Sequence, residues 1–513
     1  MDRDAEQKQK AALRKKRRRK ESIKALAIVG GVVIVGLAIV IGIIAGLVHL
    51  FTADSKKKAE TAVVAEKAVD DEPDSTGGEE AADEADADKE DAGSGADLSS
   101  VSDNEAPSQE QSEDEDSGQT AGGSIKDEKE ISSSENDRLL AAGGKEKTVA
   151  GAAGEDAEIE KRIDDEIENM SIEEKISKLF ILSPGQLAGN GIESPAIGGK
   201  AGDQLAKYPI TGILFKPGNL STEENLLSSL DHLSSYGGGN QLNVISEQGG
   251  EKSPFVLSGI TENVIASEKE IGESLGTAGA YSAGISIGSE LKHYGMQVNI
   301  APYADVPKTS GSFAAANGFN QDLETTTELA ANMVRGMKDQ NIIAAVGCFP
   351  GYGDVTNDGS NGIPVSQRTK EQLIEESAPY QAAIRAGADI VIISHVGLPK
   401  LRGDQRPASL SKEVITDIVR EEWEYDGVVM TDYMDKTCIY QKYTYAEAAV
   451  GAIEAGADIL LSTKNFQKSF EGIRDAVKKG TLTEERIDES VRRILRMKYR
   501  QEAAKESGDN LSG

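Results

Sequence analysis

Residues 389–432 contain the stretch that decides the fold: DIVIISH (389–395), SKEVITDIVREEW (411–423) and GVVMTD (427–432). The first and third segments are short apolar runs that end in polar residues, which is typical of strands buried on both faces. The middle segment spaces its apolar residues as one face of a helix does. A strand, a helix and a second strand in this order predict a parallel βαβ unit.

The same alternation extends along the chain from about residue 156. The sequence SIEE (171–174) is typical of a capping box at the start of a helix. Amphipathic stretches then separate short apolar runs: KLFIL (178–182), GILFK (212–216), NVIS (243–246), VNIAPYAD (298–305), AAVGCF (344–349), DIVIISH (389–395), GVVMTD (427–432) and DILLS (458–462). Eight such units predict an α/β fold of the closed (β/α)8, TIM-like type. An open doubly wound sheet is the alternative, but no GxGxxG or GxxxxGK[ST] motif follows any run.

The N-terminal region has a different character. Residues 25–51 are almost wholly apolar and include no Lys, Arg, Asp or Glu. A helix needs roughly 20 such residues to cross a bilayer, whereas the apolar core of a cleaved signal peptide has about 7–15. We therefore predict one transmembrane anchor over 25–51 rather than a signal peptide or a buried helix. The basic run RKKRRRK (14–20) indicates that 1–24 is cytoplasmic and that the rest of the chain lies outside the cell membrane.

Residues 52–155 are dominated by acidic and small residues and show no hydrophobic periodicity. Such a segment buries too little apolar surface to offset chain entropy, so we predict a disordered acidic linker. It explains much of the formal net charge of −31, and an acidic interaction tail is its other interpretation. The predicted organisation places the barrel at 156–502 and a flexible tail at 503–513.

Polar residues at the ends of the predicted strands are the candidates for chemistry, because barrel active sites lie at the carboxyl ends of strands. These residues are Ser246, Glu247, Asp305, Cys348, His395 and Asp432. Any one of them alone is more often a group that holds a loop. The two cysteines, Cys348 and Cys438, form no CxxC pattern, and a single disulfide between them stays open. We predict no metal, no nucleotide cofactor and no nucleic-acid partner.

The segment PASLSKEVITDIVREEWEYDGVVMTDYMD (407–435), followed by AGADILL (455–461), resembles the barrel domain of glycoside hydrolase family 3. The similarity covers most of 172–498 and is greatest to single-domain bacterial β-N-acetylhexosaminidases. It implies a (β/α)8 barrel and retaining hydrolysis of β-linked amino sugars. The family's nucleophile is the aspartate of the TD at the end of the seventh strand, which matches Asp432.

The family's proton donor is a histidine in a D-S-H triplet after the fifth strand. The matching residues are Asp358, Gly359 and Ser360, so the resemblance keeps the aspartate and replaces the histidine with serine. The family motif K-H-F-P-G-H-G reads GCFPGYG (347–353), which puts Cys348 and Tyr352 where histidines are usual.

Two further departures concern the groups that bind the sugar. The family's D-x-E-G-G element reads SEQGG (246–250), which keeps Glu247 but has Ser246 in place of the aspartate that binds a pair of sugar hydroxyls. The family's loop arginines fall near Pro254 and at Asn317. His395, by contrast, matches a position that helps to hold the sugar.

Two interpretations follow. In the first, the chain is an active glycosidase in which Asp432 attacks and Asp358, Asp354 or Glu247 supplies the proton. The candidate substrate-binding residues are then His395, Glu247, Tyr352, Cys348 and Asp305. In the second, it is a catalytically impaired relative that binds glycan or protein at the cell envelope. Both interpretations predict a carbohydrate partner, with peptidoglycan fragments as the natural candidate for a barrel held outside the membrane.

Overall fold

The computed structural model describes residues 149–509, apart from 190, 192, 194–198 and 237–239. The predicted anchor at 25–51 and almost all of the predicted linker lie outside these residues. Among the residues that are described, no helix is both long and apolar enough to cross a membrane.

The centre of the fold is one parallel sheet of eight strands with the neighbour order β7-β6-β5-β4-β3-β2-β1-β8. The ends of this order meet where Met430 pairs with Ile459 and the Thr431 amide donates to the Ile459 carbonyl at 3.0 Å. The strands are β1 (Phe180–Leu182), β2 (Gly212–Leu214), β3 (Leu242–Ile245), β4 (Val298–Asn299), β5 (Ile343–Phe349), β6 (Ile390–Ile393), β7 (Val428–Thr431) and β8 (Leu460–Leu461). The predicted α/β barrel is therefore confirmed.

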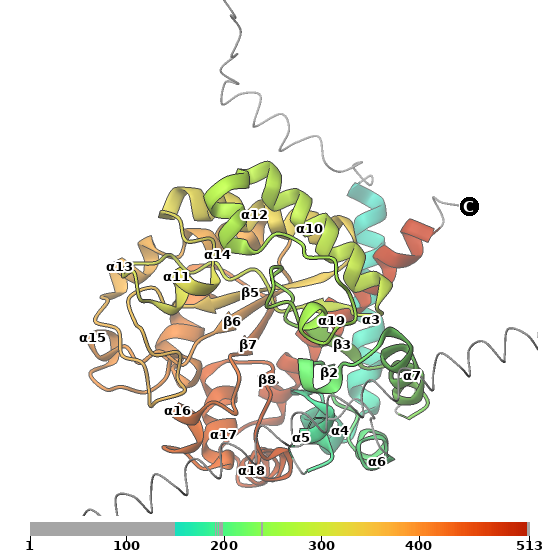
Figure 1. Cartoon of the computed structure of the whole chain (residues 1–513). Helices are drawn as coiled ribbons and strands as arrows, with labels where there is room; N and C mark the ends of the chain where they lie inside the picture. Colours follow the sequence, from blue (N-terminus) through green and yellow to red (C-terminus); the bar gives the residue numbers. More distant parts are fainter. Residues whose placement is uncertain (1–148, 190, 192, 194–198, 237–239, 510–513) are drawn as a thin grey trace, which may run out of the picture. The chain divides into compact units, whose positions relative to one another are not determined.

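Helices surround the strands, as Figure 1 shows in a view that places the strands in the middle. They are α3 (Val149–Asn169), α4 (Ile172–Ser177), α5 (Pro184–Leu187), α6 (Gly199–Lys207), α7 (Glu223–Ser234), α8 (Pro254–Leu257), α9 (Glu268–Glu270), α10 (Gly276–His293), α11 (Phe313–Asn317), α12 (Leu323–Asp339), α13 (Lys370–Glu375), α14 (Ala378–Arg385), α15 (Pro399–Arg402), α16 (Thr437–Tyr440), α17 (Tyr445–Ala455), α18 (Phe466–Lys478) and α19 (Glu484–Asp509). Shorter or wider turns are η1 (Pro217–Asn219), η2 (Ile271–Leu275), η3 (Ala408–Leu410) and η4 (Glu413–Glu422).

Local sequence explains these elements. Every residue of β5, β6 and β7 is buried, as expected for strands covered on both faces. The predicted capping box is present, because the Ser171 amide donates to Glu174 Oε2 at 2.8 Å and the Glu174 amide donates back to Ser171 Oγ at 3.3 Å. Helices α10 and α12 pack closely because Gly284 has no side chain. A Cβ at this position would lie 2.3 Å from the Met333 carbonyl oxygen.

Both ends of the described chain are helical. Helix α3 starts before the predicted boundary at 156, and α19 runs past the predicted boundary at 503. The two helices pair through long-range contacts: Arg162 lies 3.5 Å from the centroid of the Tyr499 ring, and Arg492 binds Glu160 at 3.1 Å. Such contacts between distant segments leave no local composition signal.

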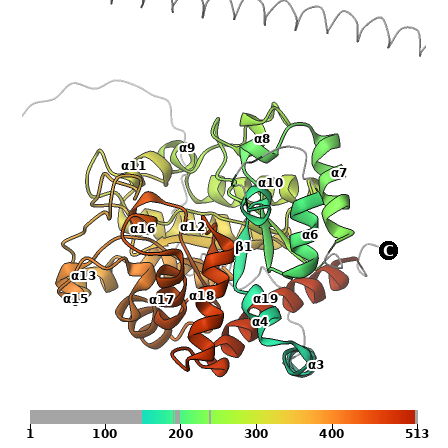
Figure 2. The same cartoon turned by 90° about the horizontal axis from the view of Figure 1, so that it is seen from below.

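The short helices α8, α9, α11 and α16 follow strands β3, β4 and β7, so they lie at the carboxyl end of the barrel. Figure 2 shows α8, α9 and α11 at the upper end and α3 and α19 at the lower end. We call the upper end the mouth of the barrel.

Candidate active site

Asp432 lies at the mouth, directly after β7, with 2% of its side chain exposed. Its amide donates to the Ile393 carbonyl of β6 at 2.8 Å, which fixes the backbone. Oδ1 accepts the Tyr433 amide at 2.7 Å. Oδ2 accepts the Tyr352 hydroxyl at 2.6 Å and Lys436 Nζ at 2.8 Å.

These donors keep the carboxylate charged. Burial by itself raises the pKa of Asp432, but the Lys436 ammonium and the Tyr352 hydrogen bond outweigh it and lower that pKa to about 2. Burial also works against the ammonium, yet Asp432 raises the pKa of Lys436 above its usual value. Asp432 is therefore an anion, and Lys436 a cation, at neutral pH.

Lys436 is a site residue that the sequence predictions missed. Its ammonium lies 5.1 Å from the centroid of the Tyr352 ring and 6.0 Å from that of Phe313, which are cation–π distances. A lysine four residues after the predicted nucleophile, on the same loop, is the signal that was available in the sequence.

Tyr352 connects Asp432 with β6. Its hydroxyl donates to Asp432 and accepts the His395 amide at 3.2 Å. Burial raises the pKa of Tyr352 well above its ordinary value, so the phenol stays protonated. Tyr352 and Asp432, which were predicted as separate site residues, are thus in direct contact.

His395 is fully buried, and both ring nitrogens have protein partners. Nε2 lies 3.0 Å from the Tyr433 carbonyl oxygen, which only accepts, so Nε2 carries the hydrogen. Nδ1 then accepts from the Ser409 hydroxyl at 2.7 Å. Burial lowers the pKa of His395, which favours this neutral ring. The side chain supports the Tyr433 backbone instead of pointing a free nitrogen into the mouth.

Asp305 holds the turn that carries Tyr352. Its carboxylate accepts the Cys348 amide at 2.9 Å, the Tyr352 amide at 2.8 Å and the Tyr380 hydroxyl at 2.6 Å. It is 1% exposed, and burial raises its pKa. Cys348 and Cys438 are both buried free thiols, so no disulfide joins them. Burial raises the pKa of both thiols, that of Cys438 to about 12.

Arg368 fastens the same turn from the other side. Its guanidinium donates to the Pro350 carbonyl at 2.7 Å and the Gly351 carbonyl at 2.8 Å. It also lies 3.2 Å from Asp354 Oδ1, while the Ser366 hydroxyl donates to Asp354 Oδ2 at 2.5 Å. Asp354, one of the proposed proton donors, is thereby paired with a cation as part of the turn.

Asp358 lies on the loop above Lys436 and is partly exposed. Its Oδ1 accepts the amide of Ser360 at 3.0 Å and also its hydroxyl. Burial opposes ionisation, but these hydrogen bonds lower the pKa of Asp358. The Gly359 carbonyl accepts the Cys438 amide at 2.9 Å, which ties this loop to α16.

Glu247 organises the loop after β3. Its carboxylate accepts the Gly249 amide at 2.8 Å and the Ser253 hydroxyl at 2.5 Å, and burial raises its pKa. Gly249 and Gly250 have φ of +74° and +73°, which suits residues without a Cβ. Glu268, a further buried carboxylate that the sequence predictions missed, accepts the Tyr303 amide at 3.1 Å, and burial raises its pKa well above the usual range.

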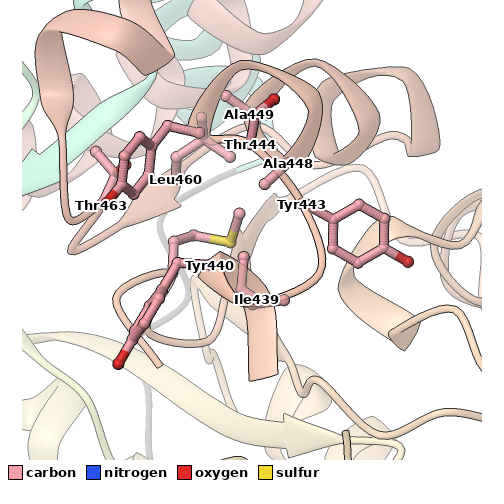
Figure 3. Close-up of a pocket in the computed structure, with 10 residues that line it drawn as sticks. Ile439, Tyr440, Tyr443, Thr444, Ala448, Ala449, Leu460 and Thr463 are labelled. Atoms are coloured by element: carbon pink, nitrogen blue, oxygen red, sulfur yellow. The ribbon is translucent and has the colours of Figure 1, made fainter. Parts of the chain in front are cut away.

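A small cavity lies beside this arrangement, between α16, α17 and β8 (Figure 3). Its volume of about 10 Å³ is room for about one water molecule. Its lining includes Ile439, Tyr443 and Leu460 and none of the predicted site residues. It therefore adds nothing to the chemistry at Asp432.

An eight-stranded parallel barrel with an ionised, buried aspartate at the end of its seventh strand is compatible with the nucleophile of a barrel glycosidase. The chain belongs to the family described as glycosyl hydrolase family 3 N terminal domain, whose pattern residues 171–497 match. The resemblance inferred from the sequence is thus confirmed.

Individual relatives agree with this assignment. Over 235 residues the chain is 26% identical to Beta-hexosaminidase A of Pseudoalteromonas piscicida, covering 42% of this chain and 39% of that protein. It is 27% identical over 220 residues to Beta-hexosaminidase LpqI of Mycobacterium tuberculosis, covering 41% and 56%. A solved glycoside hydrolase family 3 beta-N-acetylglucosaminidase from Paenibacillus sp. is 29% identical, with a TM-score of 0.59 and coverage of 65% and 63%. The chain spans about half the length of the curated relatives it matches.

Proposed function

We propose that this chain is a retaining glycosidase of the β-N-acetylhexosaminidase type that acts on β-linked amino-sugar glycans, with Asp432 as the nucleophile. The observation that carries the proposal is the carboxylate itself, which is buried at the end of β7 and kept anionic by Lys436 and Tyr352. Family membership supports the reaction class.

In this reaction a carboxylate oxygen of Asp432 forms a bond to the anomeric carbon while the glycosidic C–O bond breaks. The leaving oxygen takes the bonding pair and a proton. Water then attacks the same carbon, restores the Asp432 carboxylate and gives up a proton. The Tyr352 hydroxyl and the Tyr433 amide keep the carboxylate oriented in both steps.

Protonation of the leaving oxygen is the step that the described residues support least. Among the described residues, Asp354, Asp358 and Glu247 each accept hydrogen bonds that hold a loop, and His395 has both nitrogens occupied. Glycosides whose leaving groups need no proton should therefore react, whereas sugar–sugar bonds should react slowly.

The test uses the full-length chain in mild detergent with 2,4-dinitrophenyl β-N-acetylglucosaminide and with N,N′-diacetylchitobiose. We expect turnover of the activated substrate and little turnover of the disaccharide. Asp432→Asn should lose at least about 10³-fold of the first activity, as expected for loss of a nucleophile. Absence of turnover with the activated substrate, or full activity in Asp432→Asn, would contradict the proposal.

Ser360→His tests the missing donor directly. It restores the spacing of the family's triplet beside Asp358, whose carboxylate already contacts residue 360. We expect a gain of disaccharide hydrolysis with little change toward the dinitrophenyl glycoside. Asn361→His is the matched control, since it adds the same ring one residue away. Equal gains in both variants would contradict the assigned position.

A hydrolytically silent glycan-binding protein is the second candidate. It is favoured because Asp358 and Glu247 accept hydrogen bonds that hold loops, and both ring nitrogens of His395 have partners. Calorimetry with N,N′-diacetylchitobiose separates the two. Binding without turnover of either substrate supports the second candidate, and turnover of the activated glycoside supports the first.

We further propose that 25–51 anchors the chain in the cell membrane and that the acidic segment 52–155 holds the barrel outside, near peptidoglycan fragments. The charge pattern around the apolar run supports this topology. Protease added to intact protoplasts should release the barrel. Cleavage only after lysis would place the barrel in the cytoplasm.

A further inference from the structure

Lys216 and Asp435, which we call the rim pair, lie at the mouth beside Asp432. Lys216 follows β2, and Asp435 lies three residues after the nucleophile. Lys216 Nζ lies 3.4 Å from Asp435 Oδ2, and the two side chains are 27% and 29% exposed. The pair is thus fixed in place and still open to solvent.

Two further side chains hold the rim pair. The hydroxyl of Ser462, after β8, donates to Asp435 Oδ2 at 2.9 Å and accepts from Lys216 Nζ at 3.0 Å. Gln186, after β1, donates to Asp435 Oδ2 at 3.0 Å and to the Ser462 hydroxyl at 2.8 Å. Residues from the ends of β1, β2, β7 and β8 therefore meet at one point. A partly exposed ion pair adds little to stability, so stability alone does not account for this support.

The rim pair has unused hydrogen-bonding capacity. Asp435 Oδ1 has no hydrogen-bond partner among the residues that the structure describes, because all three donors go to Oδ2. The Lys216 ammonium has three hydrogens and two acceptors in the described chain. A free donor therefore stands beside a free acceptor. This combination matches two neighbouring hydroxyls of a pyranose, one accepting from the lysine and one donating to the aspartate.

Tyr433 links the rim pair to the nucleophile. Its amide donates to Asp432, and its ring centroid lies 5.7 Å from Lys216 Nζ. Its hydroxyl lies near Ser246, the residue that stands where the family has an aspartate that binds sugar hydroxyls. Tyr433 thus lies between the rim pair and the end of β3, where Ser246 replaces that aspartate.

We propose that the rim pair is the sugar-hydroxyl binding site of this chain and takes a vicinal hydroxyl pair of the glycan. The inference rests on the proposed glycan substrate but not on turnover. The cation and carboxylate missing at Gly347 and Ser246 are then supplied by other strands of the mouth, Lys216 from β2, which pairs with β3, and Asp435 from the loop after β7.

The test measures binding of N,N′-diacetylchitobiose to the full-length chain by calorimetry, and KM wherever turnover is found. Lys216→Met and Asp435→Asn should each weaken binding by about tenfold or more, since each removes a hydrogen bond to a charged group.

Lys338→Met is the matched control. Lys338 pairs with Asp389 at 2.7 Å, with side chains 28% and 22% exposed, but this pair bridges α12 and the start of β6 at the opposite end of the barrel. The control should leave the Kd unchanged. Deoxy analogues of the disaccharide give a check that needs no variant: removal of one of the two gripped hydroxyls should weaken binding to the unmodified protein by a similar factor.

The outcomes separate the two proposals. An unchanged Kd in both rim variants, or a loss equal to that in Lys338→Met, overturns the rim site whatever the activity. Binding that depends on the rim pair in a protein without turnover supports the rim site while the nucleophile proposal fails. If a rim variant does not fold, equal affinity for all deoxy analogues overturns the rim site.

Discussion

Lys436→Met tests the electrostatic account of the site. The change keeps most of the side-chain volume and removes the cation 2.8 Å from Asp432 Oδ2. At that distance and an effective dielectric constant of about 20, the Coulomb attraction is about 6 kcal/mol. The cost of burying both charges offsets part of it, and loss of one partner of a buried pair typically costs about 3–5 kcal/mol. Because 20% of the lysine side chain is exposed, we expect about 3 kcal/mol of destabilisation at pH 7.

Urea unfolding measures this difference. The folded-state pKa of Asp432 is lowered to about 2, so its stabilisation is present above the unfolded-state pKa near 4 and is lost as pH falls toward about 2. The gap between the parent and Lys436→Met should therefore shrink as pH falls from about 4 to about 2. Lys436→Met should also raise the pKa of Asp432 and move the acid limb of kcat/KM to higher pH.

A double-mutant cycle with Asp432→Asn isolates the pair. The double variant should be less destabilised than the sum of the single changes by at least about 1.5 kcal/mol, since each single change leaves one buried charge alone. Additive effects, or a gap that does not depend on pH, would refute the view that Lys436 holds Asp432 as an anion.

Three further changes test the supports of the site. Burial and the charge of Glu247 raise the pKa of Glu290 to about 7. The ionised carboxylate therefore lowers the stability of the fold as pH rises through that value. Glu290→Gln should add about 1–2 kcal/mol to the free energy of unfolding at pH 8 and nothing at pH 4. Arg368→Met should cost about 3–5 kcal/mol, because it leaves two backbone carbonyls and a carboxylate without their buried donor. Gly353→Ala should cost at least about 2 kcal/mol, because its Cβ would lie 2.0 Å from the Val306 carbonyl oxygen.

Exposed counterparts provide the controls for urea unfolding. Glu328→Gln on α12 and Arg406→Met should each change stability by less than about 0.5 kcal/mol, since both side chains are exposed. Gly451→Ala should not destabilise, because a Cβ there meets no atom within 4 Å. A pH-independent effect of Glu290→Gln, or costs at Arg368 and Gly353 no larger than those of the controls, would contradict the packing described for these positions.

Much of the barrel follows from the sequence because its signals are local. Each strand is a short apolar run, each helix repeats its apolar residues with the helical period, and Asp432 directly follows one of the strands. These features can therefore be recognised from neighbouring residues alone. The capping box at Ser171 is of the same kind, since both partners lie within one turn. Family motifs add the position of the proposed nucleophile without any three-dimensional information.

The partners of the site residues depended on the tertiary structure. Sequence reasoning placed Asp305, Glu247 and His395 among the sugar contacts, whereas their polar atoms bind backbone amides, hydroxyls and a carbonyl of neighbouring loops. Such bonds join residues far apart in the chain, and a strand-end polar residue looks the same in sequence whether it faces the ligand or a loop. Lys436 and the rim pair were missed for the same reason.

The sequence by itself therefore determined the barrel, the family and the place of Asp432, because hydrophobic period and strand-end position are properties of adjacent residues. Only the tertiary structure decided which charges meet. Lys216 and Asp435 are brought together by the closure of β7 and β8 onto β1 and β2, and Tyr352 reaches Asp432 from a turn that Asp305 and Arg368 hold. Closure of a barrel joins its first and last strands, and no local pattern in the chain records which side chains then share a rim.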